Sequence, residues 1–217
     1  MRKALIGLLA LCGGIAHAAD MTVLRYVDQD PGGPPYATRI LVTPDFLRMD
    51  SGEDEGDFTL LDRRRRVVIN VMHESGLAMV FAPGTLPPQL AGWKARLETG
   101  KPERGGRRFT LSVNGVICSE GIAVKHAMDA ARAMAEMKAI LAGTQYRVWK
   151  ESPPAMQNDC DLANQVWNSG DTLRLGLPIE EREFTGRSRT LESETQLPVD
   201  PGLFHVPEGM RTINAPS

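Results

Sequence analysis

The sequence predicts an α+β protein in which most of the structure is antiparallel β, and three observations lead to this expectation. Short segments rich in β-branched and aromatic residues recur along the chain, separated by clusters of Gly, Pro, Asn and Asp. The connections between the consecutive strands of residues 58–81 are too short for a parallel crossover, so these strands are expected to be antiparallel neighbours. Only one long segment, residues 123–142, has the spacing of an amphipathic helix.

The N-terminus has the features of a secretory signal peptide. Two basic residues precede an apolar run from Ala4 to Leu11, and the small residues Ala16 and Ala18 occupy the two positions that a signal peptidase reads. We therefore expect cleavage between Ala18 and Ala19 and export to the periplasm. The apolar run is too short to cross a bilayer, which needs about 20 residues, and no later stretch is apolar for that long.

The rest of the chain is expected to form one domain. Residues 1–18 are the signal, and residues 19–217 contain no Ser/Gly tract or block of charge that would divide them. Cys12 offers an alternative, in which the chain is a lipoprotein anchored through this cysteine. A small residue would precede a lipid-modified cysteine, whereas Leu11 is large, so we expect a freely diffusing protein.

The charge of the chain argues against several classes of partner. The full sequence holds 25 basic and 27 acidic residues, and loss of the two basic residues of the signal leaves 23 against 27, a net charge of −4. Because the signs are mixed and the balance is slightly acidic, the chain offers no global field for nucleic acid or for an anionic membrane surface. We expect no nucleic-acid partner and no transmembrane segment in the mature protein.

The first third of the mature chain is expected to be a series of strands. They are predicted at residues 21–27, 36–42, 46–49, 58–62, 66–72 and 77–81. The Pro- and Gly-rich residues 30–35 and the turn at residues 43–45 separate the first three. The segment from His73 to Gly76 has the right length for a hairpin connection between the last two.

The middle of the chain begins with an irregular, proline-containing segment, residues 82–106, in which residues 89–97 are a candidate short helix. A hairpin follows, formed by residues 109–113 and 116–119. Its turn is Asn114-Gly115, a dipeptide that suits the type I′ turn because both central residues of that turn need a positive φ.

The helical segment of residues 123–142 carries an apolar stripe at spacings of three and four residues, with charged residues on another face. Gly143 is expected to end this helix. Met134, Met137 and Leu141 give the second half of the stripe a deformable surface. Thioether groups also suit Cu(I), but core packing or cavity lining explains these methionines better, and we expect the three residues to contact an apolar ligand.

Two cysteines, Cys118 and Cys160, remain after loss of the signal. In an oxidising compartment an even pair predicts a disulfide, which would close a separation of 42 residues and stabilise the fold by roughly 4 kcal/mol. The alternative is a pair of free thiols that bind metal, but neither cysteine has a CxxC partner or a nearby histidine cluster. Asn158 and Asp159 are good N-caps for a short helix through Trp167, which the disulfide would join to the strand that holds Cys118.

The last third of the chain is expected to return to β structure. Residues 179–184 and 188–195 predict a hairpin of two polar strands, with at least one wet face. Residues 200–204 predict a single capped turn whose leucine or phenylalanine fills the core. The tail beyond Pro207 is expected to be frayed.

The sequence contains no motif that predicts catalysis or metal binding. It has no Gly-x-Ser-x-Gly elbow and no Ser-x-x-Lys, and His73, His126 and His205 are too far apart for a metal-binding motif. His126 and Asp129 lie three residues apart on the predicted helix, where a surface hydrogen bond explains them as well as a proton-transfer dyad does. We therefore expect no enzymatic activity, cofactor or metal.

The run of four arginines, Arg63 to Arg66, has two interpretations. It is either an anion patch, for a phosphate-bearing lipid headgroup or an acidic partner, or a polar turn between two strands. The acidic loop of residues 53–57 would balance the arginines in the second case. These surroundings favour the turn.

The order of the elements resembles a known fold. An export signal, short antiparallel strands, a mid-chain helix and further strands lead to a closing Asp200-Pro201-Gly202-Leu203-Phe204-x-Val206-Pro207-x-Gly209. This order is similar to that of the periplasmic lipoprotein-carrier superfamily, which has the LolA/LolB-like fold. An uncharacterised exported family within or near that fold is similar in more detail, at Leu47 to Asp50, Phe58 to Arg63, Val71 to Glu74 and Asp159 to Ala163.

The resemblance, which covers most of the mature chain, implies an incompletely closed antiparallel β-barrel around an apolar cavity, with the long and the short helix as a lid. In the characterised carriers this cavity shields the acyl chains of lipoproteins. We therefore expect a periplasmic, non-catalytic protein that carries a lipid, an acyl chain or a lipidated peptide. The alternative is an envelope protein-protein interaction module with a filled core and no ligand, which would use the polar 179–195 hairpin or the arginine run.

Overall fold

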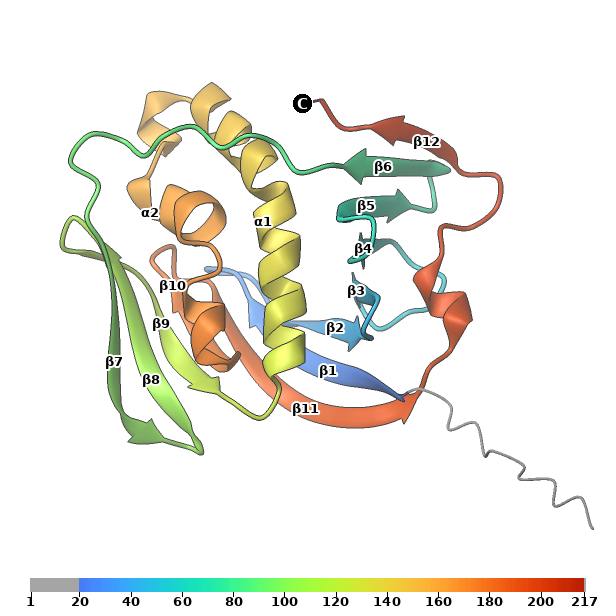
Figure 1. Cartoon of the computed structure of the whole chain (residues 1–217), viewed down its shortest axis with the longest axis horizontal. Coiled ribbons are helices and arrows are strands. Elements are labelled where there is room, and N and C mark those ends of the chain that lie inside the picture. The colour runs from blue at the N-terminus through green and yellow to red at the C-terminus, as the bar shows by residue number, and fades with distance from the viewer. Residues whose placement is uncertain (1–19, 217) are drawn as a thin grey trace, which may run out of the picture.

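The computed structural model describes residues 20–216. The predicted signal peptide, its cleavage site between Ala18 and Ala19 and the alternative anchor at Cys12 lie outside these residues. Within them the chain forms a twelve-stranded, mostly antiparallel sheet with one long helix and one short helix, which is the predicted α+β class. The sheet curves around the long helix α1, and strand β11 passes beneath it (Figure 1).

The first six strands form an antiparallel meander in chain order, of which the pairing within residues 58–81 was predicted. They are β1 (Asp20–Gln29), β2 (Tyr36–Val42), β3 (Phe46–Asp50), β4 (Phe58–Asp62), β5 (Val67–Met72) and β6 (Leu77–Phe81). Consecutive strands are antiparallel because each connection is too short for the crossover that a parallel pair needs.

Of the remaining strands, five extend the sheet from the other side of β1, and the last, β12, lies beside β6. They are β7 (Ala95–Glu103), β8 (Gly106–Val113), β9 (Val116–Val124), β10 (Leu177–Glu183), β11 (Ser188–Pro198) and β12 (Arg211–Asn214). The strand order is β12-β6-β5-β4-β3-β2-β1-β11-β10-β9-β8-β7, and the two end strands do not pair with each other, so the sheet is not closed. β12 pairs in parallel with β6, so the prediction of a frayed tail was wrong.

The hairpin between β8 and β9 has the predicted turn. Asn114 has a φ of 52° and Gly115 a φ of 87°, the two positive angles that a type I′ turn needs. The candidate helix at residues 89–97 was wrong, because its C-terminal part is the start of β7, which pairs with β8. Pairing along β8 satisfies the backbone of this part without a helix.

Helix α1 covers Met128–Glu151, so the predicted range of residues 123–142 was shifted towards the N-terminus. Ala123 and Val124 belong to β9 and pair with β10, because sheet pairing outweighs the helical preference of alanine. Gly143 lies inside the helix and does not end it. A Cβ there would lie 3.4 Å from Cα of Gly84, so the glycine lets the loop before β7 cross close to the helix.

The short helix α2 (Asp159–Leu162) begins at the predicted cap, since Asn158 Oδ1 accepts a hydrogen bond from the backbone N–H of Cys160 at 2.8 Å. A π-helical turn, Ala163–Trp167, continues it. The predicted disulfide is present between Cys118 on β9 and Cys160 on α2, with a sequence separation of 42. It joins the short helix to the sheet.

Both faces of the β1–β6 half of the sheet are buried. Leu24, Ile40 and Leu61 on the inner face pack against α1. Met21, Leu60 and other residues on the outer face pack around Phe204 of the 3₁₀ turn Pro201–Phe204. The turn is capped as predicted, with Asp200 Oδ1 accepting from the N–H of Gly202 at 2.8 Å.

A buried arginine ties this closing turn to the sheet. Arg48 on β3 is 2% exposed, and its Nε donates to Asp50 Oδ2 at 2.6 Å. Its two other nitrogens donate to the carbonyl oxygens of Leu203 and Asp54, at 3.0 Å and 2.8 Å, and the guanidinium lies 4.0 Å from the ring centroid of Phe58. One side chain therefore positions β3, the loop after it and the C-terminal turn.

None of the helices formed by residues 20–216 is both long enough and apolar enough to cross a membrane.

Removal of the disulfide is expected to destabilise the fold. In the double variant Cys118→Ser/Cys160→Ser the unfolded chain gains the freedom of a loop of 42 residues, which lowers the free energy of unfolding by about 4 kcal/mol. Urea unfolding followed by circular dichroism measures this change. A reductant should lower the midpoint of the wild type and leave that of the double variant unchanged; equal midpoints for wild type and variant would contradict the prediction.

Arg48→Met is expected to cost about 3 kcal/mol or more in the free energy of unfolding, because it leaves buried carbonyl oxygens without a donor. The matched control is Arg64→Met, whose arginine side chain is 78% exposed and whose loss should change the free energy by no more than about 0.5 kcal/mol. Urea denaturation of both variants gives the comparison. Equal effects of the two substitutions would show that the buried network does not stabilise the closing turn.

Candidate functional site

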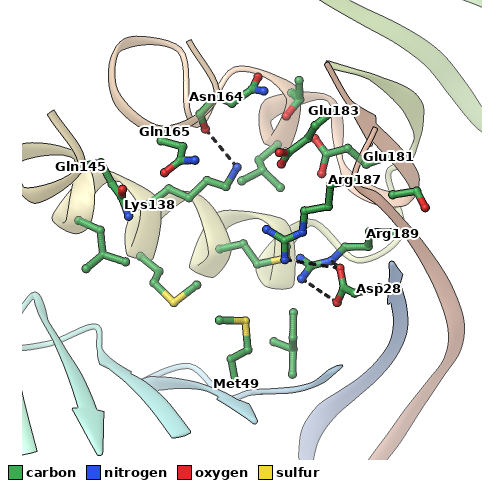
Figure 2. Close-up of a pocket in the computed structure, with 17 residues that line it drawn as sticks. Asp28, Met49, Lys138, Gln145, Asn164, Gln165, Glu181, Glu183, Arg187 and Arg189 are labelled. Carbon is green, nitrogen blue, oxygen red and sulfur yellow. Dashed lines mark hydrogen bonds and ion pairs between the residues drawn. The ribbon is translucent and has the colours of Figure 1, made fainter. Parts of the chain in front are cut away.

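A cavity of about 260 Å³ lies between α1 and the inner face of the sheet. Its lining comes from α1, the segment of residues 164–173 and strands β1, β2, β3, β10 and β11. Figure 2 shows the charged side chains of the sheet on one side of the cavity and the side chains of α1 on another. The cavity therefore has two chemically different walls.

The apolar wall contains the three residues that the sequence singled out. Met134, Met137 and Leu141, at helical spacing on α1, all line the cavity. Ile40 of β2 and Met49 of β3 line the cavity from the sheet. The methionine side chains are unbranched and polarizable, so this wall can adapt to groups of different shape.

The opposite wall is charged. Glu181 and Glu183 alternate with outward-facing residues on β10 and so point to the same face of the sheet. Arg187, from the turn between β10 and β11, and Arg189, from β11, lie beside them, and Asp28 of β1 lies beneath. Charged residues on this inner face were not predicted individually; the only sequence signal was the polar character of the 179–195 hairpin.

The arginines of this wall are engaged by β1. Arg189 donates to both carboxylate oxygens of the fully buried Asp28, at 2.8 Å and 3.1 Å. Arg187 lies 3.9 Å from Asp28 Oδ1 and 3.5 Å from Asp30 Oδ1. Among residues 20–216, no ion pair involves Glu181 or Glu183.

The pKa of the Glu183 carboxyl group is shifted by its surroundings. Burial raises its pKa, and the nearby charge of Lys138 opposes the rise only in part. Lys138 reaches across the cavity from α1, and its Nζ donates to the backbone oxygen of Asn164 at 3.3 Å. Asn164 in turn donates to the backbone oxygen of Cys118 at 3.0 Å, so the disulfide-bonded region supports this side of the cavity.

A second hollow of about 470 Å³ adjoins the cavity on the same half of the sheet, over β2 to β5. The two share Met49, Arg187 and Arg189 as lining residues. The lining of the second hollow includes the polar side chains of Asp50, Thr59 and Asn70. These three shared side chains lie between the cavity and the second hollow, so the two spaces adjoin each other there.

The arginine run forms a turn between strands, but its principal partner is α1. Arg63 donates to both carboxylate oxygens of Glu136, at 2.7 Å and 3.1 Å, and to Asp129 on the same helix. The expectation that the acidic loop of residues 53–57 balances the run was therefore wrong for Arg63. This arginine fastens α1, and with it the apolar wall, to the turn between β4 and β5.

His126 and His73 contact different side chains. His126 Nε2 lies 2.8 Å from Glu194 Oε2 on the surface and not beside Asp129. His73 packs against Phe58, with ring centroids 5.9 Å apart. In the part of the chain that the structure describes, no group of three or more His, Cys, Asp or Glu side chains is placed to hold a metal ion.

Glu183→Gln is expected to raise the stability of the fold near neutral pH. Because the pKa of Glu183 is raised in the folded state, the folded protein holds its proton more tightly than the unfolded chain does. The stability of the wild type therefore falls as the pH rises from about 4.5, the unperturbed value, through the raised pKa. The variant has no carboxyl group to ionise at this position, so its stability does not fall in this way. The difference between the unfolding temperatures of variant and wild type should therefore grow over the same pH range and stay constant above it.

Thermal unfolding at a series of pH values measures this difference. The control is Glu192→Gln, because Glu192 is exposed on β11 and its substitution should not change the pH profile. A variant at position 183 that is less stable than the wild type at neutral pH would mean that the ionised carboxylate has a stabilising partner.

No protein-family model matches the chain, and no curated protein matches it. Two solved structures of PNGF-II, in space groups C2 and P2₁, are similar over 91% of the chain. The sequence identities are 13% and 9%, and the TM-scores are 0.44 and 0.40. The chain spans about a third of the length of these PNGF-II chains, 31% and 32%.

Proposed function

We propose that this protein is a periplasmic, non-catalytic binding protein that holds a small amphipathic ligand in the cavity beneath α1. The observation that carries the proposal is the cavity with one apolar and one charged wall. Ligand sites typically combine an apolar lining with a few polar groups that fix orientation. A ligand with an apolar tail and a polar head matches both walls.

The size of the cavity limits what it encloses. Its volume of about 260 Å³ lies just below the range of roughly 300 to 1,000 Å³ that is typical of small-molecule sites. At about 30 Å³ for each water-sized group, it accommodates roughly nine heavy atoms. A long acyl chain or a lipidated peptide would place only part of its length there and extend towards the second hollow.

Burial of the tail supplies the binding energy in this proposal. Each CH₂ group that moves from water to the apolar wall contributes about 0.8 kcal/mol. The curved sheet then acts as the incompletely closed barrel of the LolA/LolB-like carriers, and α1 acts as the lid. Arg63, which joins α1 to the sheet through Glu136 and Asp129, would restrain the motion of that lid.

The competing proposal, an envelope interaction module with a filled core, finds less support. A filled core would leave no cavity behind Met134, Met137 and Leu141, whereas all three border open volume. The polar 179–195 hairpin also directs Glu181 and Glu183 to the inside of the molecule and not only to its surface.

Leu141→Trp is expected to weaken binding at least about tenfold, because the indole fills the volume that the tail would occupy. Val148→Trp is the matched control: it places the same side chain on the same helix at a position that is 54% exposed and should leave binding unchanged. Calorimetric titration with octan-1-ol, whose size fits the cavity, measures the affinity of each variant.

Native mass spectrometry of protein purified from the periplasm, followed by solvent extraction, gives an independent test. A co-purifying amphipathic molecule is the expected result. An apo mass, together with no heat on titration with octan-1-ol, would overturn the proposed function.

A further inference from the structure

We infer that the head group of the ligand is a cationic amine, held between Glu181 and Glu183 on β10. The inference rests on the proposed function and names the ligand class of the same cavity. The observation behind it is that the neighbouring arginines, Arg187 and Arg189, pair with Asp28 and Asp30 and leave the two glutamates without an ion pair.

Arg189 lies between two acidic residues of the neighbouring strands. In the sheet it lies opposite Asp28 of β1 on one side and opposite Glu181 of β10 on the other. Its guanidinium donates two hydrogen bonds, both to Asp28, which is fully buried. Glu181 is therefore left without an ion pair among the described residues, although an arginine lies opposite it.

Arg187 is also turned away from the glutamates. Its backbone oxygen accepts from the N–H of Glu183 at 2.8 Å, which closes the hairpin and brings the two residues side by side. The guanidinium nevertheless points to the end of β1, where it lies 3.9 Å from Asp28 on the strand and 3.5 Å from Asp30 in the loop that follows. Asp28 and Asp30 thus neutralise the charge of both arginines, and the carboxylate of Glu183 has no partner within ion-pair distance among residues 20–216.

Lys138 is the remaining cation of the cavity. It faces Glu183 from α1, and its Nζ donates to the backbone oxygen of Asn164 at 3.3 Å, with no ion pair among the described residues. The groups that are free of ion pairs are thus two carboxylates and one ammonium. Three carboxylates and three cations line the cavity, and Asp30, which lies outside the lining, also neutralises part of the charge of Arg187. Counted with Asp30, the acidic groups exceed the basic ones by one, and one cationic ligand would neutralise this excess.

An alkylammonium group suits these acceptors. It has three N–H donors and no acceptor, as the side chain of lysine does, and hydrogen bonds between ionised groups are the strong ones. With the head group between the glutamates, the tail lies towards the apolar wall of Met134, Met137 and Leu141. An anionic head would instead face two carboxylates, and Lys138 is the one lining cation without an ion pair among the described residues.

Calorimetric titration of the full protein with three probes of equal chain length tests the inference. The probes are octylamine, octan-1-ol and octanoate, at neutral pH and concentrations below micelle formation. We expect octylamine to bind roughly tenfold more tightly than octan-1-ol, because it gains hydrogen bonds to ionised acceptors. Octanoate should bind more weakly than octan-1-ol.

Substitutions in the charged wall assign the effect to particular residues. Glu183→Gln and, separately, Glu181→Gln should each weaken octylamine binding roughly tenfold and leave octan-1-ol binding unchanged. Glu192→Gln, on the exposed side of β11, is the matched control and should change neither. Lys138→Met should strengthen octylamine binding and weaken that of octanoate. Thermal unfolding of every variant confirms that it is folded.

The pH dependence provides a readout that does not need a variant. As the pH falls through the raised pKa of Glu183, this carboxylate is neutralised, so octylamine binding should weaken while octan-1-ol binding does not. The alkylamine stays protonated throughout, since its pKa is near that of lysine, about 10.4.

The possible failures are distinguishable. If octan-1-ol binds but octylamine binds no better than octan-1-ol or octanoate, the amine inference is overturned and the proposed function stands. Octylamine affinity that survives both glutamine substitutions would also overturn it. If none of the three probes binds, the proposed function itself fails.

Discussion

The ion pair between Asp28 and Arg189 lies where the two halves of the sheet meet. β1 and β11 are the strands that join the meander of β1 to β6 to the strands β7 to β10, and this pair links their side chains on the inner face. Arg189 also lies 5.0 Å from the ring centroid of Tyr26, whose hydroxyl donates to the backbone oxygen of Pro178 on β10 at 2.8 Å. A buried carboxylate needs such a partner, because an isolated charge in the interior is costly. The same demand draws Arg189 away from Glu181 and gives the cavity its unpaired acidic wall.

Helix α1 supplies the apolar wall of the cavity. The first turns of the helix carry buried alanines, whereas Met134, Met137 and Leu141 farther along border the cavity. Arg63 holds the helix through Glu136 and Asp129. The apolar wall is therefore deformable in its side chains while its backbone is restrained, which suits ligands of varied shape better than a rigid, complementary surface would.

Several features were predictable because they depend on local chemistry. The Asn114-Gly115 turn follows from the positive φ angles that two residues must adopt, and the cap at Asn158 from a side-chain oxygen close to free N–H groups. Features that depend on distant pairing were predicted wrongly. The alanine at position 123 is in a strand because β10 lies beside it, and β12 is ordered because β6 offers a parallel edge.

The sequence by itself determined the α+β class, the antiparallel pairing within residues 58–81, the disulfide pair and the apolar stripe of α1, since each is recorded in residue types at short spacings or in a cysteine count. Tertiary structure alone decided that the stripe borders a cavity and that Glu181 and Glu183 complete it from 40 or more residues away along the chain. It also decided which carboxylates are neutralised. An arginine opposite two acids in a sheet pairs with the more deeply buried one, and burial is a property of the folded chain that no local spacing records.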